Sequence, residues 1–143
     1  ENFIQDYQSL LNEKYRQNSV HYNQAKLHFE RKEYEKATEL FIQFEYKDIL
    51  LNLNSKAMLL KMYYEQSEFR VLESLLESVR AYLQRKKVMG YHKANYKNII
   101  RYTKKLLKVN PYSRAQKEKL KAEIAAAKPL TEKAWLLKQL AEL

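Results

Sequence analysis

Residues 20–51 read VHYNQAKLHFERKEYEKATELFIQFEYKDILL, and this stretch decides the fold of the chain. It has the pattern of two amphipathic helices joined by a short polar turn, and the pattern returns about thirty-five residues later. The matching positions are Lys26 with Lys61, Phe29 with Tyr64, Glu33 with Glu68, and Leu40 with Leu75. Such a period is typical of helical repeat arrays, whose units bury their apolar faces against one another. The pattern predicts an all-α solenoid of antiparallel helix hairpins, with about seven helices.

The composition also favours helices. The chain has 143 residues, enough to bury a core without the help of disulfides or metals. Glycine occurs only once, at Gly90. Hairpins and phosphate-binding loops depend on glycine for positive φ angles or for close approach of the backbone. Its near absence argues against β-sheets and nucleotide-binding loops.

The location of the protein is constrained by two absences. Cysteine does not occur, which is consistent with a reducing compartment. No apolar run reaches the roughly eighteen residues of a membrane-spanning helix. We therefore expect a cytoplasmic protein without a membrane partner. Because the first residue is Glu1 rather than methionine, we also expect this chain to be the C-terminal part of a longer protein.

Helical spacing divides the chain into segments within a single domain of residues 1–143. The expected helices cover residues 2–17, 19–31, 33–47, 55–66, 68–84, 91–109 and 113–127, and a short terminal helix follows. We expect residues 19–84 to form two repeat units. Residues 85–143 would form diverged helices, the last of which covers the open end of the array.

Capping and helix-breaking residues set these boundaries. Ser19 is expected to cap the second helix, and Thr131 the last one. Asn52 and Asn54 are expected to mark a break between the two units. Pro111 should end the helix of residues 91–109, because proline cannot continue a helix.

Several residues of the first unit match a known repeat pattern, namely Ala25, His28, Tyr34, Ala37 and Phe41, and the second unit matches it more loosely with Tyr63, Phe69 and Leu76. With these residues the stretch 19–84 resembles the tetratricopeptide repeat family. Lys32 and Ser67 depart from that family, since they stand where a turn glycine is usual, and Phe44 replaces an alanine. The chain is also similar to uncharacterised bacterial tetratricopeptide-like proteins, a similarity that implies no biochemical activity.

The resemblance implies a non-catalytic scaffold or adaptor that binds a peptide segment in a concave groove. The first helix of each unit would line this groove, with the candidate residues Tyr22, Lys26, Phe29, Lys61 and Tyr64. The partner would be another protein or a missing part of the same chain. The simpler interpretation, which the residue types favour, is that the aromatic rings pack between helices and the lysines are solvated.

The sequence offers little for catalysis or metal binding. His21 and His28 lie seven residues apart on one helix face, but no cysteine or aspartate accompanies them as a further ligand. The glutamates Glu30 and Glu33, with their counterparts in the second unit, flank the turns, where helix-end electrostatics explains them. Nucleophile elbows need a glycine on each side of the nucleophile, and this sequence has only one glycine, so it contains no such motif. We expect a protein that is not an enzyme and uses no cofactor or metal.

Positive charge is concentrated in one part of the chain. The net charge is +10, and the stretch from Arg85 to Lys121 holds thirteen lysine or arginine residues against one acid, Glu118. On a helix over residues 91–109, six bases share a sector about a third of a turn wide. These six, which we call the basic stripe, are Lys93, Lys97, Arg101, Lys104, Lys105 and Lys108.

The basic stripe suggests a second function. Weak binding of nucleic acid or of an acidic partner is the alternative to peptide binding. The simpler interpretation is a solvated helix face, and the sequence favours it because no groove-reading motif accompanies the charge.

Overall fold

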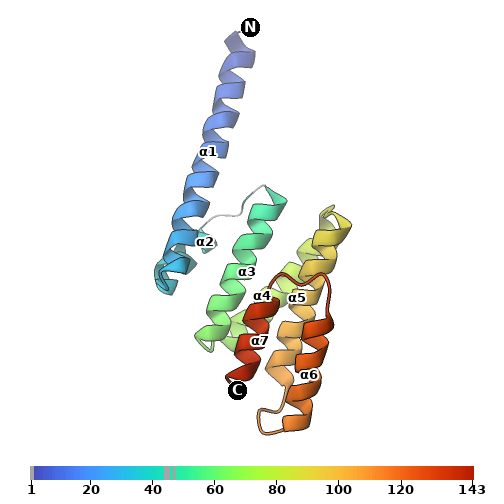
Figure 1. Cartoon of the computed structure of the whole chain (residues 1–143). Helices are drawn as coiled ribbons and strands as arrows, with labels where there is room; N and C mark the ends of the chain where they lie inside the picture. Colours follow the sequence, from blue (N-terminus) through green and yellow to red (C-terminus); the bar gives the residue numbers. More distant parts are fainter. Residues whose placement is uncertain (1, 44–45, 47) are drawn as a thin grey trace. The chain divides into compact units, whose positions relative to one another are not determined.

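The structure is a computed structural model that describes residues 2–43, 46 and 48–143 (Figure 1). Among residues 2–15 it describes the side chains of Ser9, Leu10 and Glu13. Some of our expectations lie outside the described residues. One of them concerns Phe44, which stands where the tetratricopeptide pattern has an alanine.

Every regular element of the described residues is an α-helix, which confirms the all-α class. The seven helices found there are α1 (Asn2–Glu30), α2 (Tyr34–Ile42), α3 (Ile49–Glu65), α4 (Phe69–Arg85), α5 (Gly90–Lys108), α6 (Arg114–Ala126) and α7 (Lys133–Ala141). They belong to two compact units, Glu1–Val79 and Arg80–Leu143, whose boundary falls inside α4. In the part of the chain that the structure describes, no helix is long and apolar enough to cross a membrane.

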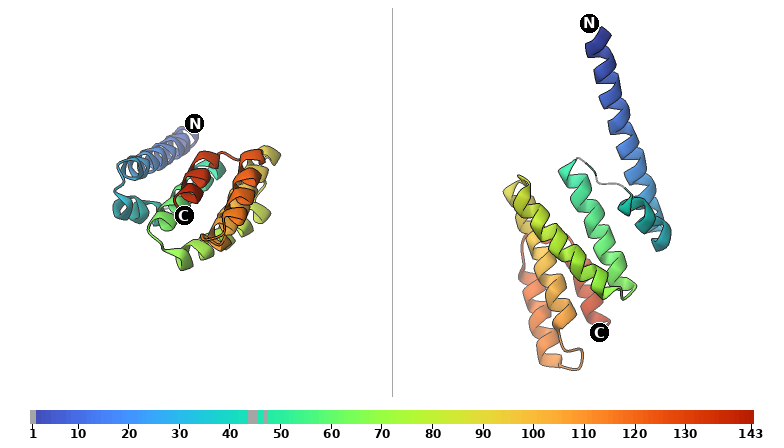
Figure 2. Two further views of the ribbon diagram at one scale, coloured as in Figure 1. Left: turned by 60° about the horizontal axis from the view of Figure 1, so that its bottom comes forward. Right: turned by 180° about the vertical axis from the view of Figure 1, so that it is seen from behind.

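In the first unit α1 and α2 form an antiparallel hairpin, and α3 packs against both (Figure 2). Ala25 of α1 and Ala37 of α2 are completely buried, and their small side chains let the helices approach closely. They join a core cluster with Phe41, Tyr46, Met58, Leu59 and Met62. Ala37, one of the residues that match the repeat pattern, therefore lies on the buried face of α2.

The same kind of turn ends α1 and α3. Lys32 and Ser67 have φ angles of 59° and 58°, in the left-handed region that glycine adopts most easily. In the first turn Lys32 N–H donates to the carbonyl of Phe29 at 3.0 Å, and Glu33 N–H donates to the carbonyl of His28 at 2.8 Å. These two bonds define a Schellman turn, which satisfies carbonyl groups at the end of a helix.

The second turn repeats this geometry thirty-five residues later. Ser67 N–H donates to the carbonyl of Tyr64 at 3.0 Å, and Glu68 N–H donates to the carbonyl of Tyr63 at 2.8 Å. Lys32 and Ser67 therefore adopt, as non-glycine residues, the left-handed backbone conformation that glycine adopts most easily.

The expected boundary within α1 is wrong. The helix runs without a break from Asn2 to Glu30, so it does not end near Gln17 and Ser19 is not a cap. Asn18 and Ser19 each cost less than about 1 kcal/mol in a helix interior relative to alanine, and neither glycine nor proline stands nearby to stop the helix.

The boundaries of the next two helices also differ from expectation. α2 ends at Ile42 rather than extending to residue 47, and α3 begins at Ile49 rather than at residue 55. The Asp48 side chain caps α3 by accepting a hydrogen bond from Leu51 N–H at 3.0 Å. Asn52 and Asn54 consequently lie within α3 and do not mark a break. This acidic cap was not recognised in the sequence.

In the second unit α5, α6 and α7 pack against one another, with successive helices antiparallel (Figure 1). Their buried apolar side chains include Ile99, Leu106, Leu120, Ile124, Leu136 and Leu140. α5 ends at Lys108, shortly before Pro111, as expected from the proline. Ser113 then caps α6 by accepting a hydrogen bond from Gln116 N–H at 3.1 Å.

Two asparagines of α5 hold the connection between α6 and α7. Asn95 is 2% exposed; its amide donates to Thr131 Oγ1 at 3.0 Å and accepts from Thr131 N–H at 2.8 Å. Asn98 donates to the carbonyl of Pro129 at 2.9 Å. Thr131 is thus bound to α5 instead of capping the last helix, whose N-cap is Glu132.

The close contact at Ala37 gives a test of the first unit. Ala37→Leu adds three carbon atoms where no space is left, so we expect the free energy of unfolding to fall by about 1–3 kcal/mol. Urea unfolding followed by circular dichroism measures the change. Ala122→Leu, at an exposed position of α6, is the matched control and should be nearly neutral. An unchanged stability of Ala37→Leu would contradict the packing described.

Candidate functional site

Tyr22, the first groove candidate, is part of the helix packing. Its ring meets those of Phe41 and Tyr46 edge to face, with centroid distances of 6.3 and 5.7 Å. Its hydroxyl forms a hydrogen bond with Asn54 of α3. Burial raises the pKa of Tyr22, and the bond to Asn54 opposes that rise. Tyr22 therefore joins α1 to α3.

Phe29 of α1 and Lys61 of α3 meet in the structure. The Lys61 ammonium lies 5.3 Å from the centroid of the Phe29 ring, within the range of a cation–π interaction. Phe29 also stacks on Tyr34 at 5.8 Å, and the Tyr34 hydroxyl donates to Glu65 Oε2 at 3.1 Å. Burial, followed by the Glu65 charge, raises the pKa of Tyr34 to about 12. These contacts tie α1, α2 and α3 together at one surface.

The two remaining groove candidates differ from each other. Lys26 is exposed on α1, on the turn of helix that precedes Phe29. Tyr64 makes an edge-to-face contact with Phe69 of α4 at 5.8 Å. The structure thus brings Phe29 and Lys61 together and leaves Lys26 exposed beside them. Tyr22 and Phe29 also contribute to helix packing, as the simpler interpretation requires.

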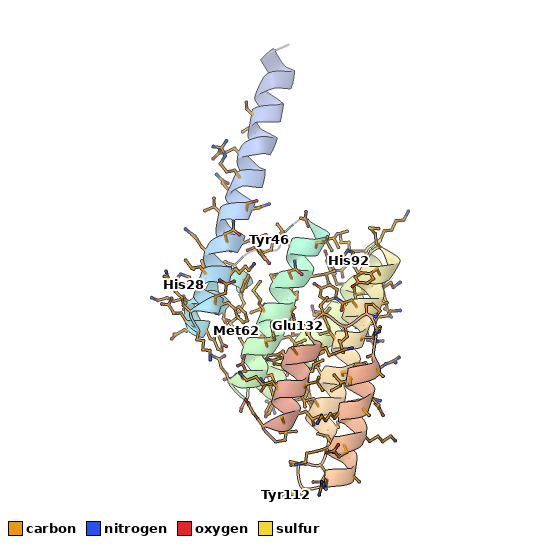
Figure 3. The ribbon with its side chains drawn as sticks, viewed as in Figure 1. His28, Tyr46, Met62, His92, Tyr112 and Glu132 are labelled. Carbon is orange, nitrogen blue, oxygen red and sulfur yellow. The ribbon has the colours of Figure 1, made fainter. Side chains whose placement is uncertain are left out.

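The two histidines of α1 have separate partners. Figure 3 labels His28 and the tyrosine that His21 contacts, Tyr46. His28 Nδ1 lies 3.2 Å from Glu33 Oε1 across the first turn. His21 Nδ1 lies 2.7 Å from the Tyr46 hydroxyl. Among the residues that the structure describes, no group of three or more histidine, aspartate or glutamate side chains is arranged to hold a metal ion.

Burial controls the protonation of the His21–Tyr46 pair. It raises the pKa of Tyr46 to about 12, with a smaller effect of Tyr22, so the hydroxyl that is hydrogen-bonded to His21 Nδ1 keeps its proton. Burial lowers the pKa of His21 below its usual 6.5. The folded state consequently favours a neutral imidazole at this position.

The basic stripe lies on α5 with uneven exposure. Lys97, Arg101, Lys105 and Lys108 are exposed, whereas Lys93 and Lys104 are half-buried. Lys105 Nζ forms a 2.6 Å ion pair with Glu123 of α6 and lies 5.7 Å from the Tyr102 ring centroid. One base of the stripe is therefore neutralised by an acid from the next helix.

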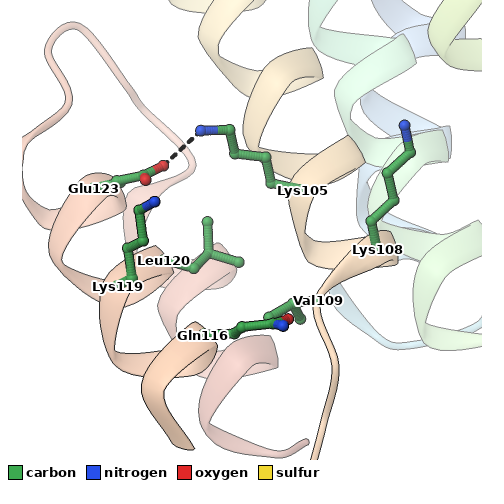
Figure 4. Close-up of a pocket in the computed structure, with 7 residues that line it drawn as sticks. All are labelled: Lys105, Lys108, Val109, Gln116, Lys119, Leu120 and Glu123. Carbon is green, nitrogen blue, oxygen red and sulfur yellow. Dashed lines mark hydrogen bonds and ion pairs between the residues drawn. The ribbon is translucent and has the colours of Figure 1, made fainter. Parts of the chain in front are cut away.

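A pocket of about 230 Å³ opens between the end of α5 and the outer face of α6 (Figure 4). Its lining residues are Lys105, Lys108, Val109, Gln116, Lys119, Leu120 and Glu123. Sequence reasoning found the α5 side of this pocket and missed the α6 side. The available signal was the spacing of Gln116, Lys119, Leu120 and Glu123, which puts these residues on one helix face.

Comparisons of this chain with protein-family models, with curated proteins and with solved structures found no match.

The lowered pKa of His21 predicts a pH dependence of stability. As the pH falls through about 6.5, the unfolded chain binds a proton at this residue before the folded chain does, so the free energy of unfolding falls. Glu33 affects stability at lower pH. The hydrogen bond to His28 is the main cause of its depressed pKa, so its contribution to the free energy of unfolding is lost only as the pH falls below about 4.5.

Urea unfolding between about pH 7.5 and pH 5.5 measures this effect. We expect His21→Gln to flatten the pH dependence in this interval, and we expect the control His92→Gln, in the other unit, to retain it. An equally steep dependence in His21→Gln would refute the assignment to His21.

Proposed function

We propose that this chain is a tetratricopeptide-like, non-catalytic scaffold that binds an extended polypeptide segment along α1 and α3. The observation that carries the proposal is the repeated Schellman turn at Lys32 and Ser67. With this turn after α1 and again after α3, we take these two helices as the first helices of two repeat units. In tetratricopeptide arrays such first helices line the peptide groove.

Contacts between these helices support the proposal. The Tyr22–Asn54 hydrogen bond and the Lys61–Phe29 contact both join α1 directly to α3. A bound segment would therefore meet a surface of fixed side chains, and fixed side chains lose little conformational entropy on binding. Preorganisation of this kind favours recognition of a flexible peptide.

The chemistry of the surface favours a segment that carries carboxylates. The ammonium groups of Lys26 and Lys61 would pair with acidic side chains or backbone carbonyls of the segment. The Phe29 ring offers apolar contact next to Lys61. Titratable groups nearby are engaged structurally: Tyr34, with a pKa of about 12, keeps its proton and donates to Glu65. A group held in this way is a poor general base, which agrees with a non-catalytic role.

The test begins with selection of peptides from a random library on the intact chain. Isothermal titration of the selected peptides then compares the wild type with Lys26→Glu combined with Lys61→Glu. Loss of charged hydrogen bonds should weaken binding about ten-fold or more. This double variant spares Tyr22, whose replacement would disturb the core.

Lys128→Glu combined with Lys138→Glu is the control, because it changes the net charge equally at exposed positions of the other unit. Selected peptides that bind the Lys26/Lys61 variant as tightly as the wild type would refute the proposed surface. Failure to select any peptide would count against the scaffold function itself.

A further inference from the structure

We propose that the pocket between α5 and α6, together with the adjoining face of α5, binds single-stranded nucleic acid through its phosphate groups. This inference concerns the second unit and is independent of the peptide-binding surface on α1 and α3. Three observations carry it: the charge and lining of the pocket, the spacing of bases along α5, and an exposed tyrosine at the turn.

The pocket has the charge that a phosphate group requires. Three ammonium groups, from Lys105, Lys108 and Lys119, line it together with one carboxylate, from Glu123. Figure 4 shows Lys105 and Lys119 directed toward Glu123, with Lys108 on the other side of the opening. Because Glu123 neutralises one of the three cations, a net charge of +2 is left for a ligand. Both Lys105 and Lys119 lower the pKa of Glu123, as neighbouring cations do.

The lining of the pocket distinguishes it from a solvated row of lysines. Val109 and Leu120 contribute apolar lining, and Leu120 is only 5% exposed. Gln116 is already fixed, since its side-chain carbonyl accepts a hydrogen bond from Asn110 N–H at 3.0 Å. The cations thus border a preformed recess with apolar and polar walls, in which a sugar–phosphate group can lose part of its hydration.

The bases along α5 extend the site beyond one phosphate. Lys97, Arg101 and Lys105 are exposed and follow one another at steps of four residues, which is about 6 Å along a helix. This step is comparable with the distance between neighbouring phosphates in an extended single strand. A polymer of phosphodiesters therefore suits the face better than an isolated phosphate does.

Tyr112 gives the reason to choose a single strand over a duplex. It is 95% exposed in the turn between α5 and α6, next to Pro111. Its N–H donates to Asn110 Oδ1 at 3.0 Å, which holds the backbone of this turn. An exposed aromatic ring beside a cationic groove is typical of proteins that bind single strands, because unpaired bases stack on the ring. In a duplex the faces of the bases are already stacked on one another and cannot be reached.

Fluorescence anisotropy of a labelled ten-nucleotide oligouridylate with the intact chain tests the inference over a salt series. Four contacts, from Lys97, Arg101, Lys108 and Lys119, predict a log–log salt slope of about −3, since each contact to a single strand contributes about 0.7. Lys108→Gln combined with Lys119→Gln should reduce the magnitude of the slope by about 1.4 and weaken binding. The matched pair Lys128→Gln and Lys138→Gln should leave the slope unchanged.

Tyr112→Ala separates stacking from charge. We expect it to weaken oligouridylate binding about five-fold or more and to leave the salt slope unchanged. An equal loss of slope in the control pair would overturn the assignment to the pocket. Polyglutamate that displaces the oligonucleotide as well as unlabelled oligouridylate does would assign the face to an acidic polypeptide instead. Unchanged affinity of Tyr112→Ala, or tighter binding of duplex than of single strand, would overturn the choice of a single strand.

Discussion

The left-handed residue at the end of α1, and again at the end of α3, is the constraint on which the first unit depends. A chain that reverses direction after a helix must satisfy the last carbonyl groups, and the Schellman turn does this with two hydrogen bonds. Lys32 and Ser67 form this turn with positive φ angles, which are energetically unfavourable for residues other than glycine. Reversal at these points sets α2 against α1 and lets Ala25 and Ala37 meet in the core.

The two units offer different surfaces because their helices carry different side chains. In the first unit, aromatic rings bridge the helices, and lysines border them where Lys61 meets Phe29. In the second unit, apolar residues and the Asn95–Thr131 bonds hold the helices, so the outer face of α5 is available for positive charge. Peptide and polyanion binding are therefore proposed for separate parts of the chain, and each proposal can fail without the other.

Features with strong local patterns were predictable from the sequence, whereas those that depend on tertiary partners were not. Helical spacing predicted the all-α class, and Pro111 predicted the end of α5. The continuity of α1 was missed because asparagine and serine are weak signals that favour caps in isolation and are tolerated inside a packed helix. The α6 wall of the pocket and the Asn95–Thr131 bonds were missed because they join segments that are distant in the sequence.

Glycine substitution at the two turns tests the central claim most directly. If Lys32 and Ser67 are strained equivalents of a turn glycine, Lys32→Gly and Ser67→Gly should each raise the free energy of unfolding by about 0.5–1 kcal/mol, because relief of strain exceeds the added entropy of the unfolded chain. Gln66→Gly, at a neighbouring residue with a φ of −90°, should lower it. Equal destabilisation by glycine at all three positions would contradict the account.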